Sequence, residues 1–487
     1  MKGCLVYRRF PYFLYLLWTI LLSVGMLEGV QAQKRPNIVL AMADDQGWGD
    51  MAYNGHPTLK TPHFDDLASS GLRFDRFYAA APVCSPTRGS VLTGRHPNRF
   101  GCFQWGYSLR PQEITIAEIL QRNGYRTGHF GKWHLGSVRA DSPVSPGMSG
   151  FQKWVSALNF FEIDPWMSKN GKAVQLKGEG SMVTVEAAIE FIQESIDADQ
   201  PFLALVWFGS PHSPHEALQE DRALYADQPD EMKNFLAEIT AMDRAMGRLR
   251  ERLRELGIAD NTVLWYTSDN GAIPQGSTGG LSGGKAELWE GGIRVPAIIE
   301  WPAVLKEPRI TDFPAGTVDI LPTVLEIAGV SEDEALHPLD GMSLLDLVRG
   351  GGSTRSKPLG FWVYPESGQR VRSDELIQQM AEEQKAGREA TAEETPPFRT
   401  GLLDKVYSSE DRPGHAAWID GDFKLHRIPD DSGTVRYALF NLSEDPEEKR
   451  DLISELPDRA REMERALEQW QRSVIDSLNG VDYHQAD

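Results

Sequence analysis

The chain contains little cysteine and no excess of positive charge. Three cysteines occur among its 487 residues, and none has a partner at Cys-x-x-Cys spacing. The usual pattern of a cysteine-bound zinc site is therefore missing. The formal net charge is −20 at pH 7, so the phosphates of a nucleic acid would be repelled. We expect no nucleic-acid partner.

Long apolar runs are also scarce, and the clearest one lies at the N-terminus. Lys2, Arg8 and Arg9 precede the segment PYFLYLLWTILLSVGML, and GVQA, ending at Ala32, resembles a cleavage site. This pattern predicts a signal peptide over residues 1–32 and therefore an exported protein, secreted or periplasmic, with no stable membrane insertion. The alternative is an uncleaved membrane anchor, because the run is close to the length that spans a bilayer.

Shorter apolar runs recur in the mature chain, and each stops at polar residues. Asn37 to Ala43 is continuously apolar, which is typical of a strand buried on both faces. Helical patterns such as Glu231 to Leu256 lie between these runs. We therefore predict an α/β fold with a large mixed, mostly parallel sheet sandwiched by helices. The polar groups that follow its strands are expected to meet at the strands' carboxyl ends. These groups are Asp44-Asp45, His212 and Asp269-Asn270.

The pattern changes near Gly350. GGSTRSKP has the composition of a linker, and LGFWVYP, HAAWIDGDFKLHRI and VRYALFNL read as short antiparallel strands. Asp458 to Leu478 predicts an amphipathic helix. We expect a larger domain over residues 33–350 and a smaller α+β domain over residues 351–487. The charged stretch from Ser373 to Pro397 predicts a solvated helix plus loop, with a lid beside a site as the alternative.

The polar strand ends suggest a metal site. Asp44, Asp45, Asp269 and Asn270 offer three carboxylates and one amide oxygen. Such ligands suit a hard divalent cation, Ca²⁺ in the first place and Mg²⁺ in the second. DDQG and SDNG also read as ordinary loop-starting turns when each is taken alone. Their shared position after apolar strands favours the metal site.

Cationic and proton-donating side chains accompany the acidic ones. GHFGKWHLG contains Lys132 and His134, which an extended segment would point the same way. Gly131 and Gly136 would let the backbone approach a ligand. The further candidates are His212 and His215 in GSPHSPHE and Lys285 in LSGGKAELWEGGIRVP. Together these residues predict a cationic pocket in an acidic protein, suited to one small anionic group.

The segment APVCSPTRGSVLTGRHP completes a resemblance to the type I sulfatases, the formylglycine-dependent members of the alkaline phosphatase superfamily. The family signature is Cys-x-Pro-Ser/Ala-Arg, three residues, then Leu-Thr-Gly. Here it is Cys84-Ser85-Pro86-Thr87-Arg88 followed by Leu92-Thr93-Gly94. Thr87 departs from the commoner Ser or Ala, but maturation depends chiefly on the Cys, Pro and Arg. The resemblance runs from PNIVLAMADDQG to LFNLSEDPEEKRDL, with five further motifs in the family's order.

The resemblance implies that a formylglycine-generating enzyme oxidises Cys84 to formylglycine, an aldehyde. One hydroxyl of the hydrated aldehyde attacks sulfur, and the other later expels sulfate by re-forming the aldehyde, so no stable sulfate ester remains. Five groups are implied as Ca²⁺ ligands: Asp44, Asp45, Asp269, Asn270 and the formylglycine oxygen at Cys84. Arg88 and Lys132 would hold the diol, and His134 would take its proton. His212 and Lys285 would contact sulfate and protonate the leaving oxygen.

Other interpretations of these residues remain open. Cys84 and Cys102 are the cysteines left in an exported chain, so a disulfide between them is one alternative. A phosphodiesterase or phosphonate monoester hydrolase of the same superfamily is a second. A non-catalytic protein that binds sulfated glycans is a third, but none of the reactive residues is missing.

The resemblance leaves the substrate open. We expect a sulfated carbohydrate, such as an N-acetylgalactosamine 6-sulfate or a related polysaccharide sulfate. The candidate residues for the substrate rim are Trp48, Trp105, Tyr107, His215, His415 and the stretch from Ser373 to Pro397. For both tryptophans and the tyrosine, packing is the alternative role. For Arg294 we predict a structural ion pair.

Overall fold

The computed structural model describes residues 1–3, 35–352, 354–388, 406–430 and 432–483. Pro36–Asp487 form one compact unit, and Met1–Arg35 form a separate one. Nearly all of the predicted signal peptide therefore lies outside the described residues. Within the described part of the chain, no helix is both long and apolar enough to cross a membrane. The predicted domain boundary at residue 350 stays a prediction.

Strand β1 (Asn37–Ala43) lies in the middle of a large sheet and has the bounds that its apolar run predicts. It pairs in parallel with β7 (Phe202–Trp207) and with β8 (Thr262–Ser268), and β7 pairs in parallel with β3 (Arg126–Lys132). Among the described residues the sheet has 11 strands, in the order β10-β2-β9-β8-β1-β7-β3-β4-β5-β6, with β11 paired to β2. The remaining strands are β2 (Leu72–Tyr78), β4 (Lys153–Ala157), β5 (Trp166–Lys169), β6 (Lys172–Gln175), β9 (Arg294–Glu300), β10 (Arg309–Thr311) and β11 (Ala315–Gly316).

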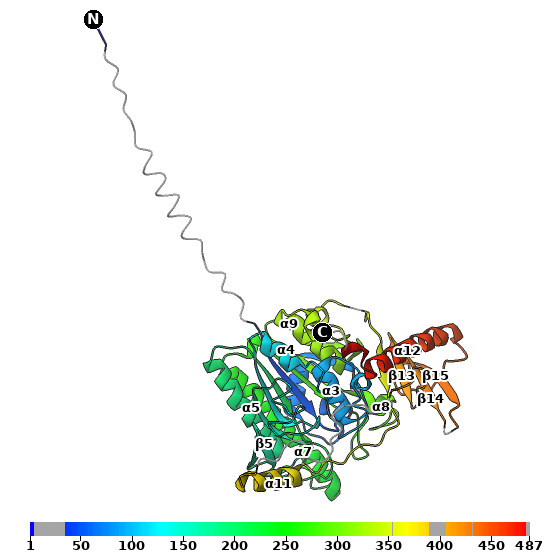
Figure 1. Cartoon of the computed structure of the whole chain (residues 1–487), viewed down its shortest axis with the longest axis horizontal. Coiled ribbons are helices and arrows are strands. Elements are labelled where there is room, and N and C mark those ends of the chain that lie inside the picture. Colours follow the sequence, from blue (N-terminus) through cyan, green and yellow to red (C-terminus); the bar gives the residue numbers. More distant parts are fainter. Residues whose placement is uncertain (4–34, 353, 389–405, 431, 484–487) are drawn as a thin grey trace. The chain divides into compact units, whose positions relative to one another are not determined.

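Helices cover both faces of this sheet. Alternate side chains of its central strands therefore enter two different cores. Ile38, Leu40 and Met42 belong to one core, and Val39 and Ala41 belong to the other. The first core takes side chains from α3 (Cys84–Thr93), α4 (Ile116–Arg122) and α9 (Ile320–Ala328). The second takes side chains from α2 (Pro62–Ser70), α5 (Gly180–Asp197) and α7 (Asp230–Glu255). The mixed, mostly parallel α/β fold is confirmed (Figure 1).

A second, antiparallel sheet follows in the order β12 (Leu359–Trp362), β13 (Ala416–Asp420), β14 (Phe423–Pro429) and β15 (Val435–Asn441). Helix α12 (Pro457–Leu478) packs beside it, with Trp470 5.8 Å from Trp418 between ring centroids (Figure 1). Side chains of this sheet also share a core with Leu288 and Ile293, which lie next to the glycine-rich loop of Lys285. The small sheet therefore supports that loop.

The predicted helices agree closely with the structure. The stretch beginning at Ser373 forms α11 (Ser373–Lys385), and the rest of that predicted helix-plus-loop region from residue 389 lies outside the described residues. The shorter helices are α6 (Gln219–Ala223), α8 (Glu290–Ile293) and α10 (Leu345–Val348).

Candidate active site

The predicted metal ligands meet because each pair follows one of two neighbouring strands that end in register. Ala43 at the end of β1 is in register with Ser268 at the end of β8, so Asp44-Asp45 and Asp269-Asn270 follow side by side. The Asp45 backbone N–H donates to Asp269 Oδ1 at 3.1 Å, and Asn270 Nδ2 donates to Asp45 Oδ1 at 2.9 Å. All four side chains are buried. The structure therefore brings the four predicted metal ligands together.

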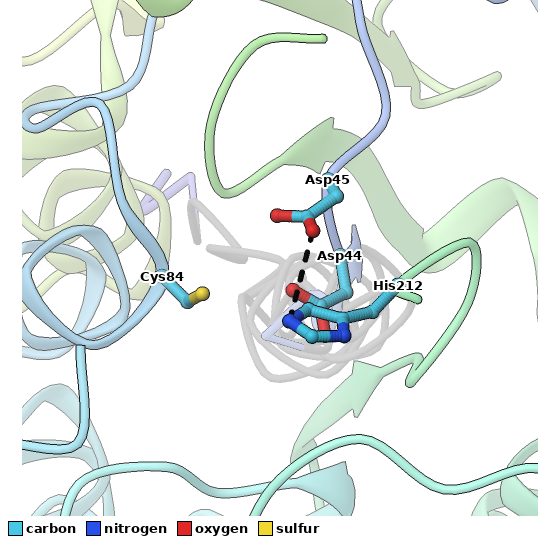
Figure 2. Close-up of side chains that lie close together, drawn as sticks. All are labelled: Asp44, Asp45, Cys84 and His212. Carbon is cyan, nitrogen blue, oxygen red and sulfur yellow. Dashed lines mark ion pairs between the residues drawn. The ribbon is translucent and has the colours of Figure 1, made fainter. Parts of the chain in front are cut away.

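Cys84 faces this group from the start of α3. Figure 2 shows its side chain on the opposite side of the site from Asp44, Asp45 and His212. One ligand atom from each of these four residues lies within 4.8 Å of the others. Every residue of α3 is buried, and Cys84 itself is 1% exposed. The unpaired backbone N–H groups of a helix's first turn favour negative charge, which suits this end of α3 to an anionic ligand.

Thr87, the residue that departs from the family signature, has a clear structural role. Its Oγ1 donates to the Ala81 carbonyl oxygen at 2.9 Å and accepts from the Ala81 N–H at 3.2 Å. Because Ala81 precedes α3, these two hydrogen bonds hold the loop that leads to Cys84 against the helix. Thr87 therefore stabilises the loop before α3, at the position where the family signature has Ser or Ala.

Three cations lie against the carboxylates. Arg88 donates to Asp269 Oδ2 through Nε at 3.0 Å and a terminal nitrogen at 2.6 Å. Lys132 Nζ lies 2.5 Å from Asp44 Oδ2. Lys285 Nζ lies 2.5 and 2.7 Å from the two oxygens of Asp45. The cations predicted for the pocket therefore lie in direct contact with the predicted acidic metal ligands.

Burial and these ion pairs shift the pKa values in the site. Burial alone would raise the pKa of Asp45, but Lys285, His212 and Lys132 together bring it well below its usual value. Burial raises the pKa of Asp269 to about 6 even though Arg88 opposes the shift. Burial also raises the pKa of the Cys84 thiol to about 12. The thiol is therefore protonated at neutral pH, whereas a cysteine nucleophile must be a thiolate.

The two predicted catalytic histidines are held differently. The His212 ring stacks on Phe160 with 4.4 Å between centroids and an interplanar angle of 11°. Its Nδ1 lies 2.5 Å from the Ser213 carbonyl oxygen, so Nε2 faces the site, 3.7 Å from Asp45 Oδ2. Burial lowers the pKa of His212 to about 3.

His134 is 3% exposed, and neither ring nitrogen has a hydrogen-bond partner among the described residues. Burial and then Lys132 hold its pKa well below the usual value, so its imidazole is neutral.

Two expectations about the segment of Lys132 and His134 were wrong. His134 has a φ of 54°, so the chain is not extended there. The glycines beside these residues make room for protein rather than for a ligand. A Cβ on Gly131 would lie 1.8 Å from the Trp207 carbonyl oxygen, and one on Gly136 would lie 2.4 Å from Val144. Close packing of β3 on β7 explains Gly131.

The donor set fits a hard cation. Asp44 Oδ1 and Asn270 Oδ1 are buried oxygens without a hydrogen bond to any described residue. A buried oxygen that lacks a hydrogen bond is costly unless another group binds it. Together with Asp45 and Asp269 these atoms form an all-oxygen group of the type that Ca²⁺ prefers. His212, which was predicted to contact sulfate, also lies within the candidate metal-binding group.

A cavity of about 820 Å³ lies beside this group. Its wall includes the predicted Cys84, His134, His212 and Lys285 and also Trp105 from the predicted rim. Sequence reasoning missed several other lining residues: Asn159, Phe160, Glu162, Glu216, Arg370 and Arg372. Phe160 and Arg370 lie outside any chemical motif, so no local signal could have found them. Of the charged stretch after residue 373, Ser373, Asp374 and Glu375 line the cavity.

The other predicted rim residues lie elsewhere. Trp48 stacks under Arg294 at 5.0 Å, and Tyr107 is 3% exposed. His215 Nδ1 is 3.5 Å from Glu238, and His415 hydrogen-bonds to His426 at 2.8 Å.

Two further interpretations have clear outcomes. The structural ion pair of Arg294 is confirmed, at 3.7 Å from Glu290. The disulfide alternative is wrong, because Cys84 and Cys102 are both free thiols. Cys102 Sγ instead lies 3.7 Å from the Tyr107 carbonyl oxygen.

The chain is similar in sequence to known sulfatases. The family described as Sulfatase matches residues 36–330. The chain is 30% identical over 364 residues to an ulvan-active sulfatase of Formosa agariphila, covering 70% of each protein. It is 30% identical over 392 residues to the N-acetylgalactosamine-6-sulfatase of Canis lupus familiaris, covering 71% of this chain and 72% of that one. Arylsulfatase A of Homo sapiens is 29% identical over 485 residues, covering 92% and 90%.

Solved structures share the fold. A crystal structure of Ps i-CgsB in complex with k-i-k-neocarrahexaose has a TM-score of 0.74 at 24% identity, covering 90% of this chain and 93% of that one. The phosphonate monoester hydrolase of Agrobacterium radiobacter has a TM-score of 0.59 at 20% identity, covering 91% and 96%. The family match and the curated relatives, together with the shared fold, define a hydrolase of the alkaline phosphatase superfamily. Within it the chain belongs to the type I sulfatase family, whose members act on sulfate esters.

Proposed function

We propose that the protein is an exported, calcium-dependent sulfatase that releases sulfate from a sulfated carbohydrate, with formylglycine derived from Cys84 as its nucleophile. The observation that carries this proposal is the position of Cys84, at the buried start of α3, facing Asp44, Asp45 and His212. Two relatives of about 30% identity are named for ulvan and for N-acetylgalactosamine 6-sulfate, which supports a carbohydrate substrate.

The proposed metal ligands are the side chains of Asp44, Asp45, Asp269 and Asn270. Ca²⁺ bound there would polarise a sulfate oxygen and favour an ionised nucleophile. The buried oxygens of Asp44 and Asn270 that lack a hydrogen bond to any described residue support this assignment. Arg88 would orient the ligand Asp269, to which it makes two hydrogen bonds.

The remaining residues would handle charge and protons. Lys132 would balance the negative charge around residue 84, because it lies beside Asp44 at the end of β3. His134, neutral and without a hydrogen-bond partner in the described chain, would accept the proton from the nucleophile's second hydroxyl at its free ring nitrogen. Lys285 Nζ and His212 Nε2 would face the sulfate group, and the protonated Lys285 would hold the proton for the leaving oxygen.

Sulfate release by ion chromatography tests the proposal. The protein is co-expressed with a formylglycine-generating enzyme, and mass spectrometry checks the conversion of Cys84. The panel contains sulfated mono- and oligosaccharides, an aryl sulfate and an aryl phosphonate, with Cys84→Ala as the control. We expect sulfate from one sugar position, absent in the control. Activity on the phosphonate alone would instead place the protein with the phosphonate hydrolases. Converted protein that releases nothing, yet binds sulfated glycans as the control does, would indicate a binding protein.

A further inference from the structure

The cavity is larger than one sulfate group requires. Its volume of about 820 Å³ lies in the upper part of the range for sites that enclose a whole small-molecule ligand. Trp105 and Arg370 line it together with Cys84, Lys285 and the two histidines, but the proposed chemistry uses neither. These two side chains are therefore available to bind another part of the substrate.

Trp105 is an exposed aromatic side chain on a rigid support. It is 36% exposed, which is unusual for a large apolar residue in this protein. Gly368 packs directly against the indole, since a Cβ there would lie 2.0 Å from Trp105 Cε2. The Gln369 N–H donates to the Trp105 carbonyl oxygen at 2.9 Å. No aromatic ring among the described residues stacks on Trp105, so its free surface faces the cavity.

The same contacts tie Trp105 to the proposed nucleophile. The Gly106 N–H donates to Ser85 Oγ at 2.8 Å, and Ser85 follows Cys84. Gly106 also lies tightly against the next segment, because a Cβ on it would be 2.1 Å from the Gln369 carbonyl oxygen. The position of the indole is therefore fixed relative to residue 84.

Arg370 follows Gln369 and carries an unneutralised charge. Its side chain is exposed, and its guanidinium makes no ion pair or hydrogen bond within the described chain. Arg372, by contrast, pairs with Glu375 at 3.0 Å. Burial and the neighbouring Glu238 hold the pKa of Glu162 well above its usual value, so this carboxyl contributes little negative charge to the wall. Of the other acidic lining residues, Glu375 pairs with Arg372, and among the described residues Glu216 and Asp374 make no ion pair with Arg370. An anionic group in the cavity would therefore find Arg370 free.

We propose that Trp105 and Arg370 form a saccharide subsite beside the sulfate group, which takes a sugar ring linked to the sulfated sugar and bearing an anionic group. The indole would stack on the apolar C–H face of that ring. The planar guanidinium of Arg370 would bind a carboxylate or a second sulfate with two hydrogen bonds. This inference rests on the proposed function, because it names the neighbour of the sulfate that the enzyme removes.

Paired substrates and variants test the subsite. The probes are N-acetylgalactosamine 6-sulfate alone and its disaccharides with glucuronate, with glucose and with a sulfated glucose. Arg370→Ala is expected to lower kcat/KM on the glucuronate and sulfated disaccharides about ten- to a hundred-fold, mainly through KM. Its effect on the neutral disaccharide and on an aryl sulfate should be at least tenfold smaller. Trp105→Ala should weaken all three disaccharides, and Trp105→Phe should restore part of the loss.

Controls separate this inference from the proposed function. Arg388→Ala removes the same charge from an exposed position outside the cavity lining and should leave every rate unchanged. Calorimetry with Cys84→Ala protein measures disaccharide binding without turnover, so it stays informative if no sulfate is released from any probe. Binding that falls with Arg370→Ala then supports the subsite even where the sulfatase proposal fails. Equal losses on all substrates, no preference for anionic disaccharides, or no disaccharide binding would each overturn it.

Discussion

Lys424 Nζ lies 2.8 Å from Glu290 Oε1, and neither side chain is exposed to solvent. Lys424 belongs to β14 of the small sheet, whereas Glu290 begins α8, five residues after Lys285. Glu448 completes the group, 3.0 Å from Lys424. This buried ion pair therefore joins the small sheet to the loop that carries a proposed catalytic lysine.

Replacing Lys424 should strongly destabilise the protein. Lys424→Met removes the nearest cation from the buried carboxylates of Glu290 and Glu448, and it leaves Glu290 only the longer ion pair with Arg294 at 3.7 Å. Removing one partner of a buried ion pair costs about 3–5 kcal/mol. Urea unfolding monitored by fluorescence measures the change. The control is Lys449→Met, because Lys449 pairs with Glu447 at the surface and such pairs contribute about 0–1 kcal/mol. Equal effects of the two substitutions would contradict the prediction.

Calcium should stabilise the fold independently of activity. Ca²⁺ would bind the oxygens of Asp44 and Asn270 that lack a hydrogen bond, and it would add to the charge that Arg88, Lys132 and Lys285 already place beside the three carboxylates. At a free concentration 100 times its Kd, a ligand of the native state adds about 2.7 kcal/mol to the free energy of unfolding. Thermal unfolding after chelation, and again after Ca²⁺ is restored, measures this effect. Asn270→Ala should remove most of it. A Tm that is insensitive to calcium would argue against the site.

Substitution of Cys84 should abolish activity, whereas substitution of Cys102 should largely preserve it. Cys84→Ala removes the proposed precursor of the nucleophile, so sulfate release should fall by about a thousand-fold or more. Cys102→Ala removes a buried thiol with no proposed chemical role and should keep most of the activity, at a cost of about 1 kcal/mol in stability. Sulfate release at matched protein concentration, with unfolding curves for both variants, distinguishes the two. Retained turnover by Cys84→Ala would exclude the proposed nucleophile.

Stability should fall in mild acid because of His96. This side chain is 1% exposed, and burial lowers its pKa to about 3, with Asp340 and Arg99 acting in opposite directions. The unfolded chain binds a proton at about pH 6.5, so the native state is progressively disfavoured between pH 6.5 and pH 3. The expected loss from pH 6.5 to pH 5 is about 2 kcal/mol.

Urea unfolding at the two pH values compares the wild type with His96→Asn. The asparagine can still accept a hydrogen bond from the Asn98 N–H, which the histidine accepts at 3.3 Å. The variant should lose about 2 kcal/mol less than the wild type on acidification. An identical pH dependence would show that another group is responsible.

The sequence predicted those parts of the site that depend on single strands. The apolar run at Asn37–Ala43 has the bounds of β1, because a strand buried on both faces leaves no polar interruption. Parallel pairing in register then brings Asp44 and Asp269 together. Phe160 and Arg370 could not be predicted in this way, because their positions depend on how distant loops pack. The roles expected for Gly131 and Gly136 were wrong for the same reason, since each glycine meets a neighbouring part of the chain.

The complete burial of α3 would set an order of events for the proposed oxidation of Cys84. An enzyme that oxidises Cys84 must bind the surrounding segment in its own active site, and Pro86 and Arg88 are as inaccessible in the folded chain as the cysteine. On the proposed function, oxidation must therefore take place while the segment is still unfolded. Folding would then close the site over a residue that has already been modified, and a chain that folds first would remain an inactive thiol form.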